Sequence, residues 1–134
     1  MIKIVLDTNV LVGGWLSPSN PPGRIIDALR TEQIQLVLDD RIFLEYGEVL
    51  RRPKFERFIR QEEREWILDY IFHSAQRITS TFTFPDLPDP YDACLLEVAA
   101  TANVQLVTGN LKHFPKNQRH NVVVLSPSEF QSRR

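Results

Sequence analysis

The chain has 134 residues, of which 43% are hydrophobic and 25% charged, and its formal net charge is −1. This length suits a single compact domain, residues 1–134, and leaves no room for a second one. The net charge excludes a globally basic nucleic-acid binder, so any attraction to a polyanion must come from local clusters.

The chain contains one cysteine, Cys94, which excludes an internal disulfide and a multi-cysteine zinc site. A reducing, cytoplasmic location fits this content best. The apolar run at the start is broken by Asp7 and Asn9, so it resembles neither a signal peptide nor a membrane span. We therefore expect a cytoplasmic protein with no membrane attachment.

The first segment predicts a buried strand that ends in a polar turn. Residues 2–6 form a short β-branched apolar run, followed by Asp7-Thr8-Asn9, which is typical of a central parallel strand. A helix over residues 10–16 is interrupted by Gly13-Gly14. The proline-rich residues 17–22 then predict an ordered loop or lid.

Helices and strands alternate along the rest of the chain. After the proline-rich residues we expect a helix with Ile25, Ile26 and Leu29 inward. Further helices are expected at residues 39–50, capped by Asp39 and Asp40, at 61–75, and at 89–101, capped by Asp89. Strands are expected at 35–38, 77–79, 104–107 and 122–125, and the last residues, 131–134, are expected to fray. This alternation predicts an α/β fold with a central, mostly parallel sheet of about five strands covered on both faces.

Ligands of open parallel sheets bind just beyond the carboxyl ends of the strands, and this rule singles out Asp7. An acid in a turn beside a buried strand is partly desolvated and needs a cation or hydrogen-bond donors. A role in an Asx-turn or as a helix cap explains Asp7 equally well.

Two further acids are expected at inward-facing positions of helices. Glu45 falls at the rim of the apolar stripe of its helix and should be half-buried, whereas Glu48 points away. Asp92 lies in the first turn of its helix on the inward face, and Glu97 is expected to point outward. A surface glutamate at position 45 and compensation of the helix dipole by Asp92 are the alternatives.

Three acids at one edge of the sheet would repel one another unless a hard cation lay between them. Oxygen ligands suit magnesium or manganese, and do not distinguish between the two. Because no histidine stands near these acids at zinc spacing, zinc is disfavoured. The pattern therefore predicts a site for Mg²⁺ or Mn²⁺.

Four segments match a known family: VLDTNVLV, FLEYGEVLRRPKF, LPDPYDACLLEVAATA and LVTGNLKHFP. In this order the sequence resembles the PIN-domain family over nearly its whole length, and within it the VapC-like toxins of toxin–antitoxin pairs. The resemblance implies a Rossmann-like three-layer sandwich and a metal-dependent endoribonuclease acting on RNA. It also implies a homodimer and a small antitoxin protein that blocks the site.

By position, the resemblance makes Asp7, Glu45 and Asp92 the metal-binding acids. Many family members place a fourth acid where Asn110 stands. Asparagine supplies an amide but no charge, so we expect one well-held ion, with Asn110 contacting a water of that ion. In the implied reaction, a water steered by Asp7 or Asp92 attacks the phosphodiester in line, leaving a 5′-phosphate and a 3′-hydroxyl.

Other residues are expected to support this centre or to guide RNA. Thr8, Asn9 and Thr108 would orient the acids and pin the turns, although turn chemistry alone is an equal explanation. Two basic clusters are candidate contacts to the RNA backbone, and their main members are Arg51 and Arg52 in the first and Lys112, His113 and Lys116 in the second. A solvated charged face is the alternative for the first cluster. Phe114, beside His113, is a candidate for stacking on a base or for the core.

Two other functions compete with a nuclease. A degenerate PIN domain would bind RNA or a protein partner without cleaving, and Asn110 is the motive for this alternative. A phosphoryl-transfer enzyme or receiver domain would accept phosphate on Asp7. The phosphatase type wants a second acid where Asn9 stands, and the receiver type a lysine where Ser126-Pro127 stand.

Overall fold

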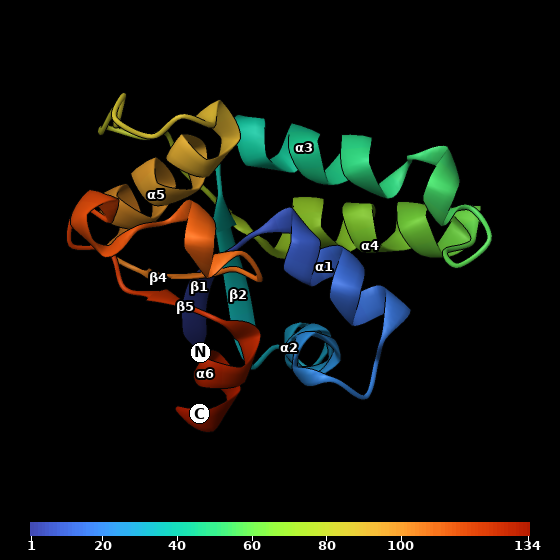
Figure 1. Cartoon of the computed structure of the whole chain (residues 1–134). Coiled ribbons are helices and arrows are strands. Elements are labelled where there is room, and N and C mark those ends of the chain that lie inside the picture. Colours follow the sequence, from blue (N-terminus) through green and yellow to red (C-terminus); the bar gives the residue numbers. More distant parts are fainter.

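The computed structural model describes residues 1–134 and contains a parallel five-stranded sheet between layers of helices (Figure 1). The strands are β1 (Ile2–Leu6), β2 (Ile34–Leu38), β3 (Gln76–Arg77), β4 (Gln105–Val107) and β5 (Val124–Leu125), in the spatial order β3-β2-β1-β4-β5. The helices are α1 (Thr8–Leu16), α2 (Pro21–Arg30), α3 (Asp40–Leu50), α4 (Gln61–Ser74), α5 (Pro90–Ala102) and α6 (Pro127–Ser132). The predicted α/β class with a parallel sheet of about five strands is confirmed.

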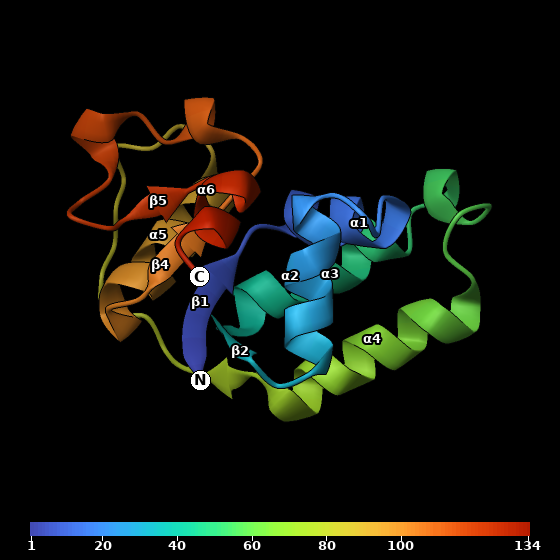
Figure 2. The same ribbon diagram turned by 90° about the horizontal axis from the view of Figure 1, so that it is seen from below.

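Helices cover both faces of the sheet. Helix α5 lies across β1, β2 and β4 on one face, and α2 and α6 pack side by side on the other (Figures 1 and 2). Because both faces are covered, the successive residues Ile4, Val5 and Leu6 are all fully buried instead of alternating in and out. None of the helices combines the length and apolarity that crossing a bilayer requires.

The strand order creates one crevice at the carboxyl edge of the sheet. The strands that follow β1 are added outward on one side as β2 and β3, and the chain then crosses to the other side of β1 to form β4 and β5. Such a switch point is where open α/β sheets bind ligands. The backbone N–H of Asp7 donates to the carbonyl of Val107 at 2.9 Å, so the turns after β1 and β4 begin side by side.

The expected break at Gly13-Gly14 is wrong, because α1 continues through both glycines. A Cβ at Gly14 would lie 2.6 Å from the carbonyl oxygen of Pro22 and 2.5 Å from a side-chain carbon of Ile26. Glycine is therefore needed for the close approach of α1 and α2, and does not end the helix. The expected loop is also shorter, since Pro21 already begins α2.

Residues 127–132 form a short helix, α6, which reaches into the segment 131–134 that we expected to fray. Ser126 and Glu129 cap this helix reciprocally, and Phe130 anchors it with 2% of its surface exposed. A serine followed three residues later by glutamate is the sequence pattern of a capping box. The helix that follows is short and contains few apolar residues, so hydrophobic periodicity did not predict it.

Two aromatic side chains take distinct places. Trp66 is half-exposed and stacks on Tyr70, with ring centroids 5.5 Å apart. Phe114 is fully buried in the core, which decides between its two expected roles and excludes stacking on a base. The ends of the later strands differ from the predicted ones by one or two residues, which is the usual uncertainty of such boundaries.

The two glycines of α1 give a matched test of its packing. Gly14→Ala should lower the free energy of unfolding by about 1–3 kcal/mol, because the methyl group overpacks the contact with α2. Gly13→Ala, whose Cβ would meet only Pro22 at 3.8 Å, should be neutral or stabilise by up to about 1 kcal/mol through helix propensity. Urea unfolding of both variants checks this, and equal effects would contradict the assigned role of Gly14.

Candidate active site at the carboxyl edge of the sheet

Asp7 is a buried carboxylate held between the ends of β1 and β4, with 6% of its surface exposed. The hydroxyl of Thr108 donates to Asp7 Oδ2 at 2.8 Å and accepts from the backbone N–H of Asn110 at 3.0 Å. In the facing turn, Asn9 Oδ1 accepts from the backbone N–H of Gly109 at 3.1 Å. The two turns are therefore locked together by side chains on both sides of Asp7.

The pKa of Asp7 reflects a conflict between burial and hydrogen bonding. Burial raises the pKa above its ordinary value, and this effect exceeds all others. The hydroxyl of Thr108 and the backbone N–H groups of Thr8 and Asn9 act in the opposite direction, as does the nearby His113. The net result is a carboxyl group that is stabilised by donors but still costs free energy when charged.

Two tyrosines that the sequence analysis did not single out bring helices to this edge. The hydroxyl of Thr8 lies 2.6 Å from that of Tyr91, in the first turn of α5. The hydroxyl of Tyr46, on α3, donates to the carbonyl of Leu6 at the end of β1. In the sequence both residues look like apolar packing positions, so only the tertiary contacts show their second use.

Asp92 is the second buried acid, with 7% of its surface exposed. Its helix α5 is capped by Asp89, whose carboxylate accepts from the backbone N–H of Tyr91 at 2.8 Å. Burial, together with the negative charges of Asp89 and Asp7, raises the pKa of Asp92 to about 6, although His113 acts in the opposite direction. His113 Nδ1 lies 3.2 Å from Asp92 Oδ2.

His113 does not stand at zinc-ligand spacing from the acids in the sequence, yet the fold places it beside Asp92. The sequence places it 21 residues after Asp92, and the turn that follows β4 brings it back to the start of α5. Its imidazole makes its only recorded polar contact with the Asp92 carboxylate. His113 therefore belongs to the acidic pocket itself.

Glu45 is the third acid, half-buried on α3 as expected. Burial is the main cause that raises the pKa of Glu45. The negative charge of Glu48 also raises this pKa, and Arg52 lowers it. A pocket of about 410 Å³ has Asp7, Glu45 and Asp92 in its wall, together with the following residues: Thr8, Asn9, Arg52, Lys54, Asp89, Tyr91, Asn110 and His113. The three acids thus come from three different elements to one pocket.

The candidate RNA contacts separate into two groups. Arg52 and His113 line the acidic pocket, and Lys112 lines an adjoining pocket of about 530 Å³ that also contains Asp92. Arg51 turns away and pairs with Glu65 at 3.1 Å. Lys116 is exposed and lines neither pocket.

The donor set of the pocket fits a hard cation. Its potential ligands are carboxylate oxygens and the amide of Asn110, and the negative charge of Asp7 raises the pKa of both Asp92 and Glu45. A cation would relieve this repulsion. No three acid, histidine or cysteine side chains in the structure converge closely enough to hold one ion together. Glu45 lines the same pocket and forms no ion pair there.

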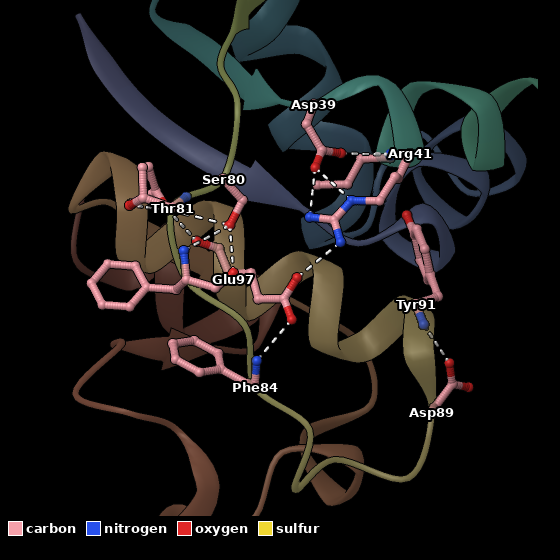
Figure 3. A network of polar contacts seen from close by, with 11 residues as sticks. Asp39, Arg41, Ser80, Thr81, Phe84, Asp89, Tyr91 and Glu97 are labelled. Carbon is pink, nitrogen blue, oxygen red and sulfur yellow. Dashed lines mark hydrogen bonds and ion pairs between the residues drawn. The ribbon is translucent and has the colours of Figure 1, made fainter.

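Glu97 lies inside the protein with 5% of its surface exposed, so the expectation that it points outward is wrong. Figure 3 shows the reason: its carboxylate accepts from Arg41 Nη1 at 2.9 Å and from the backbone N–H of Phe84 at 2.9 Å. Arg41 also pairs with Asp39 at 2.7 Å. A buried acid is tolerated here because each oxygen has a donor.

This network connects the two helices that carry acids of the pocket. Asp39 caps α3 by accepting from the backbone N–H of Ile42 at 3.0 Å, and Glu97 lies in the middle of α5. Arg41 joins the two carboxylates and so fixes the start of α3 against α5 (Figure 3). The relative positions of Glu45 and Asp92 therefore depend partly on Arg41.

The comparisons with known proteins agree with this geometry. Residues 3–112 match the family model described as PIN domain, so the chain belongs to the PIN-domain family. This confirms the resemblance drawn from the four sequence segments. An uncharacterised protein of Methanocaldococcus jannaschii is 29% identical over 110 residues, which cover 81% of this chain and 71% of that protein.

A solved structure supports the fold independently. It is that of VapBC2 from Rickettsia felis bound to a DNA fragment from their promoter, with a TM-score of 0.65 and 19% sequence identity. The match covers 94% of this chain and 98% of the matched chain. At this identity the match shows a shared PIN-like fold.

The Arg41 network can be tested by stability. Arg41→Met should lower the free energy of unfolding by about 1–3 kcal/mol, because the Glu97 carboxylate stays buried without its main partner. Adding Glu97→Gln should restore part of this loss, since a neutral amide oxygen still accepts from Phe84. Arg51→Met is the control, because its exposed pair with Glu65 should contribute at most about 1 kcal/mol. Similar losses in Arg41→Met and Arg51→Met would contradict the network's role.

The raised pKa of Asp92 predicts a pH-dependent stability without divalent cations. Since folding raises this pKa, the protonated group stabilises the fold below about pH 4, and this contribution is lost as the pH rises through about 6. Asp92→Asn should therefore match the parent at pH 4 and melt at a higher temperature at pH 7. Thermal unfolding in EDTA checks this, with Glu48→Gln as an exposed control. A difference in melting temperature between Asp92→Asn and the parent that is the same at both pH values would contradict the raised pKa of Asp92.

Proposed function

We propose that this PIN-domain protein is a metal-dependent endoribonuclease, in which Asp7, Glu45 and Asp92 hold Mg²⁺ or Mn²⁺. The observation that carries the proposal is the pocket in which these acids, brought by β1, α3 and α5, meet at the switch point of the sheet. Burying two of them costs stability that a cation would return. Such a cost is typical of functional sites.

A divalent cation supplies Lewis acidity and neutralises negative charge on a phosphodiester. The chain itself positions the groups around it: the hydroxyl of Thr108 fixes one oxygen of Asp7. Asp92 or Asp7 orients the attacking water and accepts its proton. His113, in contact with Asp92, can return a proton to the leaving oxygen, giving a 5′-phosphate and a 3′-hydroxyl.

The basic side chains beside the pocket support RNA as the substrate. Arg52, Lys54 and His113 line the pocket of the acids, and Lys112 lines the adjoining pocket that also contains Asp92. Phosphates of a bound strand would therefore meet basic side chains close to the acids. Binding through such contacts should weaken steeply as salt is raised. Asn110, which lines the same pocket, can donate its amide hydrogens to a phosphate oxygen.

The partners follow from the same proposal. The matched Rickettsia structure is a VapBC complex, and we infer that this chain is likewise the toxin of a toxin–antitoxin pair acting in the cytoplasm. A small antitoxin protein would cover the acidic pocket, and two copies of the chain would form a homodimer.

A PIN domain that binds RNA or a protein partner without cleaving is the second candidate. The observations that favour it are the amide of Asn110 in the place of an acid and the lack of three ligands converging on one point. It predicts RNA binding without metal-dependent cleavage.

Cleavage of labelled RNA by the purified, antitoxin-free protein tests the function. We expect cutting with Mg²⁺ or Mn²⁺ and none in EDTA. Asp7→Asn should reduce the rate by roughly a hundredfold or more, since even partners of metal ligands contribute 10–100-fold. Glu48→Gln, an exposed glutamate on the helix of Glu45, should cut at the parent rate.

Metal binding is measured separately by thermal unfolding. A cation at a hundred times its Kd should stabilise the parent by about 2.7 kcal/mol and Asp7→Asn much less. Stabilisation without cutting, across a broad RNA pool, would favour the non-cleaving alternative. The absence of both metal-dependent stabilisation and RNA cutting would overturn the proposed metal site.

A further inference from the structure

A second and larger cavity, of about 880 Å³, lies at the opposite end of the sheet. Its wall includes Ile2 and Gln105, which begin β1 and β4, and it shares no residue with the acidic pocket. Five residues of extended strand separate Ile2 from Asp7, a distance of roughly 16 Å at about 3.3 Å per residue. The cavity is therefore a separate place on the molecule, of a size that suits a small ligand.

The charge of this cavity is one-sided. Lys3, Arg133 and Arg134 line it, and no aspartate or glutamate does. None of the three cations forms a salt bridge, and Arg134 contacts only the side-chain amides of Gln33 and Gln131. Arg133 also lowers the pKa of Glu129, which lies outside the cavity wall, and the positive charge that remains on the wall favours an anionic ligand.

The same wall offers an aromatic surface. Phe82 is 47% exposed and lies against Phe84, with ring centroids 5.6 Å apart. Phe84 stacks in parallel on His120 at 3.8 Å, and the His120 ring is held by Asp86 at 2.9 Å. Figure 3 shows that the backbone of Phe84 is in turn fixed by Glu97. The exposed face of Phe82 therefore stands on a rigid support, as a stacking platform requires.

Free amide groups complete the lining. Asn103, Gln105 and Asn121 make no side-chain hydrogen bond within the chain, so both donors and acceptors remain available. Three of the four non-glycine residues with positive φ also lie here, namely Asn103, His120 and Asn121. Backbone held in this region costs free energy and is enriched at binding sites.

We propose that this cavity binds a nucleoside phosphate. The base stacks on Phe82, its polar edge meets the amides of Asn103 and Gln105, and the phosphate is held by Lys3 and Arg133. An acyl chain would leave the amides unpaired, so it fits this lining less well. Two sources share the chemistry: a free nucleotide, and a nucleotide within an RNA strand whose other part lies in the acidic pocket.

The test uses the Asp7→Asn protein in EDTA, so that neither cleavage nor metal-dependent binding at the acidic pocket contributes. Binding of AMP, GMP, CMP and UMP is measured by calorimetry, and that of a fluorescein-labelled tetraribonucleotide by anisotropy. Added to this background, Phe82→Leu and Lys3→Gln should each weaken binding by about tenfold. The matched controls are Phe58→Leu and Arg24→Gln, both exposed and outside the cavity, which should have no effect.

Each outcome decides the proposal. Binding of a mononucleotide with the expected losses supports it and identifies a free nucleotide as a ligand. Binding of the tetranucleotide alone, with the same losses, supports it and identifies the RNA strand as the source. Competition by inorganic phosphate as strong as that by nucleotides would overturn it in favour of a bare anion site. Tighter binding of an acidic aromatic peptide, equal losses in the controls, or no binding at millimolar concentration would also overturn it.

Discussion

The hydrogen bond from the Thr108 hydroxyl to the Asp7 carboxylate joins the ends of two strands that are 101 residues apart in the chain. It places a charged group where the apolar interior of the sheet meets solvent. Everything else at this edge is arranged around that charge: Asn9 closes the opposite turn, and Tyr91 and Tyr46 bring α5 and α3 to the same point. The crevice between β1 and β4 thus becomes a polar site supported by the most rigid part of the fold.

The buried acids of this protein are stabilised in two different ways. Glu97 is fully paired by Arg41 and the backbone of Phe84, so its charge ties α3 to α5. Asp7 and Asp92 lack a cationic partner of that strength, and burial raises their pKa. A carboxylate paired within the chain serves the structure, whereas one left with a raised pKa is available to a ligand.

The order of elements, the parallel sheet and most helix positions could be predicted, because each follows from local periodicity and capping residues. The failures also have local causes. Gly13-Gly14 looked like a helix break, yet Gly14 is needed for contact with α2. Glu97 looked like a surface residue because its partner, Arg41, is 56 residues away. The helix after the capping box at Ser126 was not predicted, because it is short and has few apolar residues.

The sequence by itself determined the family, the fold class and the acids that reach the carboxyl edge, since strand and helix ends depend on neighbouring residues. Tertiary structure alone decided what surrounds these acids. It brought His113 against Asp92, turned Arg51 toward Glu65, buried Glu97 and built the cationic cavity at the other end of the sheet. Burial and charge pairing depend on residues distant in the chain, and a single sequence carries no local signal for such encounters.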